Sequence, residues 1–245
     1  MKPKRLPRLR LLSAGLLVLA ECAAGSARAA FPDVVAEVKR SVVAVGVVSP
    51  LRNPRFRFLG TGFVVGNGNQ VVTNAHVLAA VPQNDENEKL VIALSGLGRV
   101  LARPVTKEAA DPDHDLALLR FEGPPMPALS LGDSATARDG QDVAWTGFPL
   151  GGAMGITSVT HRGIISAITP VGQPLVNSAR ALDTETLRRL PVGTYSVLPL
   201  DIVSYPGHSG RPLYDVNTGE VLGIPNIVFV RGPKESALTN PPGIP

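Results

Sequence analysis

The chain has little cysteine, few aromatic residues and no long apolar run. Cys22 is the only cysteine among 245 residues, which excludes an internal disulfide framework and a cysteine-based metal site. Aromatic residues make up 4% of the chain, whereas Val, Leu, Ala, Gly and Pro are abundant. This composition favours many short strands joined by tight turns over a helical bundle. Gly60-Thr61-Gly62 lacks the later glycine of a dinucleotide-binding loop and no metal-binding motif is present, so we expect neither cofactor nor metal.

The first 29 residues form a segment of their own. Basic residues precede an apolar run at 11–20, and Ala27-Arg28-Ala29 follows with the small-x-small pattern that signal peptidase cleaves. The run of about ten residues is too short to span a bilayer as a stable helix. We therefore predict a secretory signal peptide over residues 1–29, cleaved near Ala29, and a periplasmic or secreted protein without a stable membrane span. A retained anchor is the alternative. Lipid anchoring at Cys22 is not expected, because Glu21 stands where a bacterial lipobox needs a small residue.

All of the excess positive charge belongs to this segment. The whole chain has a formal net charge of +4, but residues 1–29 hold six of its 24 Lys and Arg residues and one of its 20 Asp and Glu residues. The remaining chain carries 18 basic and 19 acidic residues. Such a balance gives no electrostatic reason to expect a nucleic-acid partner, and we predict none.

The rest of the chain predicts many strands in two halves. Apolar residues at helical spacing predict a helix over 31–40, and a Pro-rich stretch at 122–127 separates the halves. Residues 170–194 predict a long surface loop. Short apolar runs bounded by turn residues predict strands at 41–48, 62–65, 70–73, 90–94, around Val105, 116–121, 143–146, 163–168, 195–200, 212–214, 221–224 and 227–230, with an Asn-Gly hairpin turn after residue 66. The prediction is an all-β fold of two antiparallel six-stranded β-barrels, formed by residues 30–125 and 126–245.

Three short segments carry residues typical of nucleophilic catalysis. They are V-V-T-N-A-H at 71–76, D-H-D-L-A-L-L at 113–119 and P-G-H-S-G-R-P at 206–212. A serine hydroxyl becomes a good nucleophile when an imidazole removes its proton, and a buried carboxylate fixes the tautomer of that imidazole. His76, Asp115 and Ser209 are the candidates for this triad.

The choice of histidine follows from context. His208 neighbours Ser209 in sequence, where side chains diverge, and His114 and His161 lie in polar, turn-like contexts. His76 remains, at the end of an apolar strand.

The choice of aspartate is between three candidates. Asp111 and Asp113 fit a solvated turn, whereas Asp115 directly precedes an apolar run and should be partly buried. In the serine segment, Gly207 and Gly210 permit a tight turn, in which the amides of Gly207 and Ser209 can form an oxyanion hole.

Together these segments resemble the trypsin-like serine protease superfamily and, within it, the bacterial HtrA/Deg group. The resemblance covers nearly the whole chain after the signal, through G-T-G-F-V-V at 60–65, V-V-T-N-A-H-V at 71–77, D-L-A-L-L-R-F at 115–121, G-F-P-L-G at 147–151, G-I-I-S-A at 163–167, P-G-H-S-G-R-P-L at 206–213 and G-E-V-L-G-I at 219–224. The order His, Asp, Ser fits this group.

The resemblance implies a chymotrypsin-like double barrel with the active site at the interface of the two barrels. It also implies an exported serine endopeptidase acting in protein quality control. Its partners would be polypeptide substrates, including misfolded proteins, and HtrA-like proteins are often trimers. Val203 resembles the base of the first specificity pocket, where an apolar residue implies small or aliphatic substrate side chains. No sequence remains after the second barrel for a PDZ domain, and we expect none.

Two residues depart from the usual pattern of the group. His208 replaces an asparagine, at a position that mainly shapes the loop. Arg211 replaces a glycine: a positive φ there would distort the oxyanion turn, whereas an extended backbone would let the side chain reach solvent. A third departure is Pro242-Gly243-Ile244-Pro245, which resembles the start of a strand of the group cut short. The alternative function that follows from Arg211 and this short C-terminus is a protease-fold binding or chaperone-like protein with little hydrolytic activity.

Overall fold

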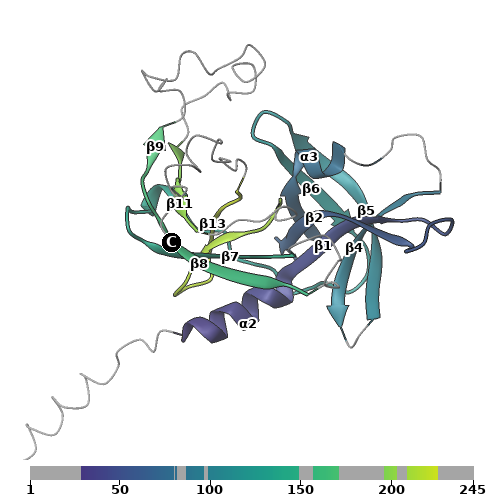
Figure 1. The fold of residues 1–245 in the computed structure, drawn as a ribbon, viewed down its shortest axis with the longest axis horizontal. Helices are drawn as coiled ribbons and strands as arrows, with labels where there is room; N and C mark the ends of the chain where they lie inside the picture. The colour runs from purple at the N-terminus through teal and green to yellow at the C-terminus, as the bar shows by residue number, and fades with distance from the viewer. Residues whose placement is uncertain are drawn as a thin grey trace, which may run out of the picture.

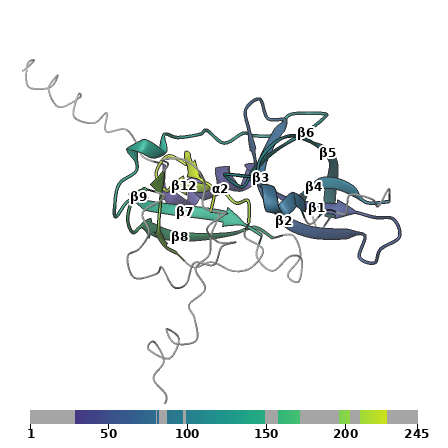
Figure 2. The ribbon, with the colours of Figure 1, turned by 90° about the horizontal axis from the view of Figure 1, so that it is seen from above.

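The computed structural model describes residues 29–79, 81, 87–96, 99–148, 157–170, 196–202 and 209–225. Two β sub-structures lie side by side, as Figures 1 and 2 show, and a helix packs below their junction in Figure 1. The predicted all-β, two-barrel class is confirmed.

The first sub-structure is a closed barrel with strand order β1-β2-β3-β6-β5-β4. Its neighbouring strands are antiparallel. A short helix, α3 (Ala75–Ala79), follows the third strand. The strands are β1 (Val42–Val48), β2 (Phe56–Val65), β3 (Gln70–Asn74), β4 (Lys89–Gly96), β5 (Arg99–Asp111) and β6 (Leu116–Phe121).

The second sub-structure is a curled antiparallel sheet of order β11-β8-β7-β12-β13, with a separate pair β10-β9. Its elements are the 3-10 helix η1 (Ser134–Thr136) and the strands β7 (Asp142–Gly147), β8 (Val159–Ile165), β9 (Thr169–Pro170), β10 (Ser196–Val197), β11 (Leu200–Asp201), β12 (Leu213–Asp215) and β13 (Val221–Gly223). The single strand predicted at 195–200 is instead two short strands in different sheets. The strand predicted at 227–230 and most of the loop at 170–194 lie outside the described residues.

Strand β1 is buried on both faces, and its alternating side chains explain why. Val43 and Val45 point into the barrel, where they pack with residues such as Val71 and Leu119. Val42 and Ala44 belong to another cluster, which also contains Ala144, Tyr214 and Val216 of the second sub-structure. The side chains on one face of this Val-rich strand therefore fill the first barrel, and those on the other face pack in the junction between the two sub-structures.

The helix α2 (Phe31–Ser41) closes that junction cluster from outside. Val34 and Val38, one turn apart, are its buried apolar residues. Pro32 in the first turn and basic residues in the last turn suit the two ends of a helix. Within the described part of the chain, no helix is both long and apolar enough to cross a bilayer.

The Pro-rich segment between the halves runs along the first barrel. The amide of Met126 donates to the carbonyl of Gly68 at 2.9 Å, and that of Leu129 to Val64 at 2.9 Å. In the hairpin turn at this end of the barrel, positive φ values fall on Gly66 and Gly68. The predicted hairpin turn between β2 and β3 is confirmed, and its left-handed residues are the two glycines on either side of Asn67.

Candidate active site

The end of β3 brings a histidine and an aspartate together. Strand β3 ends at Asn74, the chain turns into α3, and His76 is the second residue of that helix. Its Nδ1 lies 2.6 Å from Oδ2 of Asp115, and its backbone amide donates to Oδ1 of Asp115 at 2.8 Å. The carboxylate accepts, so Nδ1 carries the proton and Nε2 is left to act as a base. Asp115 is the shielded member, with 17% of its side chain exposed against 50% for His76.

Asp115 stands at the entrance of β6, as predicted, and closes the turn that follows β5. Its φ of 56° lies in the left-handed region, which Asp tolerates better than most residues. Its amide donates to the carbonyl of Pro112 at 3.2 Å, while its own carbonyl accepts from the amide of Ala75 at 3.0 Å. The aspartate is therefore fixed through its backbone as well as its side chain.

A second histidine–aspartate pair lies in the same turn. Nδ1 of His114 is 2.6 Å from Oδ2 of Asp111, and both side chains are about half exposed. The hydrogen bond from His114 lowers the pKa of Asp111 below its usual range. Asp111, predicted to lie in a solvated turn, is half exposed at the start of the turn that carries Asp115 and is hydrogen-bonded to His114 there.

Ser209 lies in a turn held against the first barrel. Its carbonyl accepts from the amide of Thr61 on β2 at 2.8 Å. The next residue, Gly210, has a φ of 81°, and a Cβ there would overlap the carbonyl of Thr61 and the hydroxyl of Thr73. Thr73 itself donates to that carbonyl at 2.7 Å. Only glycine fits this position without moving the two strands.

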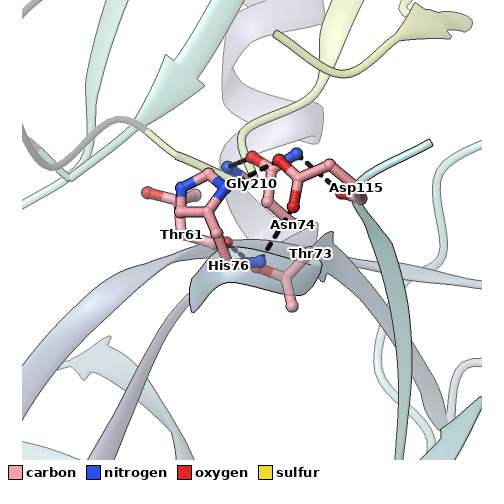
Figure 3. A network of polar contacts seen from close by, with 6 residues as sticks. All are labelled: Thr61, Thr73, Asn74, His76, Asp115 and Gly210. Carbon is pink, nitrogen blue, oxygen red and sulfur yellow. Dashed lines mark hydrogen bonds and ion pairs between the residues drawn. The ribbon is translucent and has the colours of Figure 1, made fainter. Parts of the chain in front are cut away.

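Asn74 connects the serine turn to the aspartate. Its Oδ1 accepts from the amide of Gly210 at 2.6 Å, and its Nδ2 donates to the carbonyl of Asp115 at 3.0 Å. Figure 3 shows its amide between these two groups, beside His76. Asn74 was treated only as part of the motif around His76. No signal in the sequence singles it out, because Gln70 and Thr73 of the same strand are polar as well. In the structure Asn74 is fully buried.

Arg211 has neither a positive φ nor a solvent-exposed side chain, the two outcomes expected from the sequence. Among the described non-glycine residues only Asp115 has a positive φ, so Arg211 does not strain the turn. Its side chain does not reach solvent either: the residue is 1% exposed, and its guanidinium carbon lies 3.5 Å from the ring centroid of Trp145. Burial lowers its pKa to about 9. The strain that motivated the binding-protein alternative is therefore absent.

His161 lies in the middle of β8, opposite Trp145, rather than in the predicted turn. Burial, and then the charge of Arg211, lower its pKa. The polar neighbours of His161 in sequence suggested a turn, but pairing with β7 and β11 makes the segment a strand.

The remaining predicted site residues, Gly207 and Val203, lie outside the described residues, as does His208. The structure thus brings His76 and Asp115 together and ties the Ser209 turn to them through Asn74, while the full triad stays a prediction. Over the ranges that the structure describes, no three metal-ligating side chains gather.

Comparison with known proteins adds to this geometry. Residues 60–224 match the trypsin-like peptidase domain family. Two curated relatives, each named "Probable periplasmic serine endoprotease DegP-like", come from Pseudomonas putida and Halomonas elongata, at 32% identity over 174 residues and 33% over 176. Each alignment covers 71% of this chain, which spans only 30% of the relative's length.

Two solved structures share the fold. Deg5 matches with a TM-score of 0.58 at 23% identity, covering 85% of this chain and 90% of that one. The HtrA-type protease AlgW with a decapeptide matches with a TM-score of 0.60 at 22% identity, covering 82% and 60%.

Proposed function

Because the chain belongs to the trypsin-like peptidase family, we propose that it is an exported serine endopeptidase of the HtrA/Deg type, with His76, Asp115 and Ser209 as its catalytic triad. The observation that carries the proposal is the 2.6 Å contact between His76 and Asp115, with the serine turn bonded to the same network. A carboxylate that accepts hydrogen bonds from both the ring nitrogen and the backbone amide of a histidine holds the imidazole in one tautomer and one orientation.

The reaction would proceed by acyl transfer. The hydroxyl of Ser209 attacks the scissile carbonyl while Nε2 of His76 takes its proton, and the amides of Gly207 and Ser209 stabilise the oxyanion. His76 then gives the proton to the departing amine, which leaves an acyl-enzyme. Water attacks that ester with His76 again as base, and the acid product and free Ser209 result. Asp115 stays ionised throughout and stabilises the charged imidazole.

The substrates and the setting are part of the proposal. Val203 would form an apolar base of the specificity pocket, which favours small or aliphatic side chains before the scissile bond. The relatives are named periplasmic, which agrees with a signal peptide over residues 1–29 cleaved near Ala29. Misfolded polypeptides in that compartment would be the substrates, and the assembly would be a homotrimer.

Cleavage of one protein in two states tests this proposal. The purified chain is incubated with a globular substrate, either native or permanently unfolded by reduction and alkylation, and new amino termini are counted. We expect cleavage of the unfolded form after small or aliphatic residues, and loss of about 10⁴-fold or more in rate on Ser209→Ala. Equal cleavage by Ser209→Ala would refute the mechanism, and preferred cleavage after arginine would refute the assignment of Val203.

A further inference from the structure

The peptide bond that follows Ser209 is fixed at both ends by the first barrel. Its carbonyl, which belongs to Ser209, accepts from the amide of Thr61 at 2.8 Å. Its N–H, which belongs to Gly210, donates to Oδ1 of Asn74 at 2.6 Å. A peptide unit is planar, so two bonds at opposite ends define its orientation. The backbone of the proposed nucleophile is thus oriented by β2 and by one side chain at the end of β3.

The same side chain fixes the backbone of Asp115. Nδ2 of Asn74 donates to the carbonyl of Asp115 at 3.0 Å, and the amide of Ala75 donates to that carbonyl as well. These bonds hold a residue with a φ of 56°, in the sparsely populated left-handed region. Asn74 is fully buried. If either hydrogen bond is lost, a buried polar group is left without a partner, which lowers the stability of the folded protein.

We propose that Asn74 is a positioning residue that couples Asp115 to the serine turn and so sets the geometry between the two ends of the triad. Aspartate and serine come from segments far apart in the sequence, on either side of the junction between the two sub-structures. An amide is suited to join them, because it accepts from Gly210 at one atom and donates to Asp115 at the other. A carboxylate would serve only the first contact, and alanine would serve neither.

This inference rests on the proposed function and predicts a loss in turnover rather than in substrate affinity. Asn74→Ala should lower kcat by about 10²-fold, the scale of a displacement of about 1 Å in a catalytic group, and leave KM within a few-fold. Tyr214→Phe is the matched control. It also removes a buried side-chain hydrogen bond, 2.9 Å to Thr146, but in the second sheet away from Asn74. It should leave kcat within a few-fold of the wild type.

Asn74→Asp separates positioning from mere stability. A protonated carboxyl can both accept from Gly210 and donate to Asp115, as the amide does. Burial against the backbone carbonyl of Asp115 raises the pKa of the introduced acid, because desolvation and the carbonyl oxygen both disfavour its charged form. The ratio of kcat for Asn74→Asp to kcat for wild type should therefore rise as pH falls from about 8 to about 5, while the same ratio for Asn74→Ala stays flat. A flat ratio for Asn74→Asp would overturn the proposal.

Amide exchange at Gly210, followed by NMR, gives a readout that needs no catalysis. Loss of the bond to Asn74 should speed exchange of this amide in Asn74→Ala by at least about 10-fold, with the amides of β12 unchanged. If wild type does not hydrolyse peptides, the proposed function fails and Gly210 exchange alone decides whether Asn74 holds the turn. Unchanged exchange would refute the coupling whatever the activity.

Discussion

Replacing Arg211 by methionine should stabilise the protein. Burial lowers the pKa of Arg211 to about 9, which at about 1.36 kcal/mol per pH unit corresponds to a cost of several kcal/mol for burying the charge. Stacking on Trp145 at 3.5 Å returns about 2 kcal/mol. Arg211 makes at least one further interaction, which offsets another part of this cost. Methionine keeps an unbranched apolar chain against the indole, so Arg211→Met should raise the free energy of unfolding by about 1–3 kcal/mol at neutral pH, within the range seen when buried charges are replaced by apolar residues.

Urea unfolding of wild type and Arg211→Met measures this difference, and its dependence on pH identifies the cause. The pKa of Arg211 is lower in the folded than in the unfolded protein, so from about pH 9 up to the ordinary pKa of arginine the unfolded state binds more protons. Wild-type stability therefore gains from this group as pH rises through that window. The advantage of Arg211→Met should shrink above pH 9, while other groups titrate alike in both proteins.

Arg211→Gly separates charge from volume. It removes the charge but leaves a void beside Trp145, so it should be less stable than Arg211→Met by about 2–5 kcal/mol. Because the positive φ lies at Gly210 and not at Arg211, the methionine variant should keep its rate of reaction with an active-site probe. Arg211→Met less stable than wild type by more than about 1 kcal/mol would show that the buried charge is fully compensated and would refute the reasoning.

Three further predictions test other parts of the site and its support. Gly210→Ala should lower the free energy of unfolding by about 3–4 kcal/mol, because alanine is strained in the left-handed region and hydrogen bonds at Thr61 are lost. Gly140→Ala is the control: Gly140 has a similar φ of 76° but open space around it, so the loss should be only about 1 kcal/mol. Equal losses for the two variants in denaturant unfolding would contradict the overlap with Thr61. Burial alone would raise the pKa of Asp215, but hydrogen bonds from Gln141 and from the amides of Asn217 and Thr218 outweigh it and lower the pKa. Its stabilising contribution is complete above the unfolded pKa of about 3.9 and is lost as pH falls through the lower folded value, so Asp215→Asn should flatten the pH dependence of stability in that acid range; an unaltered acid-unfolding curve would argue against it. Asp111→Ala removes the partner of His114 and frees the turn that holds Asp115, so kcat should fall more than KM changes; a variant with wild-type kcat would show that the turn is held without this pair.

The sequence predicts a strand of the first barrel wherever the apolar pattern of the segment matches the burial of its side chains in the fold. The Val-rich segment that became β1 is apolar on both faces because both faces are buried. Strand β5 was predicted only around Val105, since Pro104, Lys107 and Glu108 interrupt any alternation. It forms because β4 and β6 both pair with it and close the barrel, which is a property of the sheet and not of the segment.

The candidate site likewise contains residues that the sequence predicts and residues whose role depends on contacts made only in the fold. His76 and Asp115 were accessible from sequence because each adjoins an apolar strand that fixes its position. The role of Asn74 was not accessible, since its two partners come from distant segments that meet only in the fold. Arg211 was judged as a turn residue with solvent on one side, but the ring of Trp145, contributed by β7, offers the long side chain a buried surface.

Mass-spectrometric mapping of a fluorophosphonate adduct tests the central claim, that His76 activates Ser209, most directly. The reagent reacts with a serine only when a base raises its nucleophilicity. We predict one adduct, on the peptide that contains Ser209, absent in Ser209→Ala and formed at least about 10³-fold more slowly in His76→Ala. Folded wild-type protein that forms no adduct, or an adduct on Ser209 that forms equally fast in His76→Ala, would contradict the account.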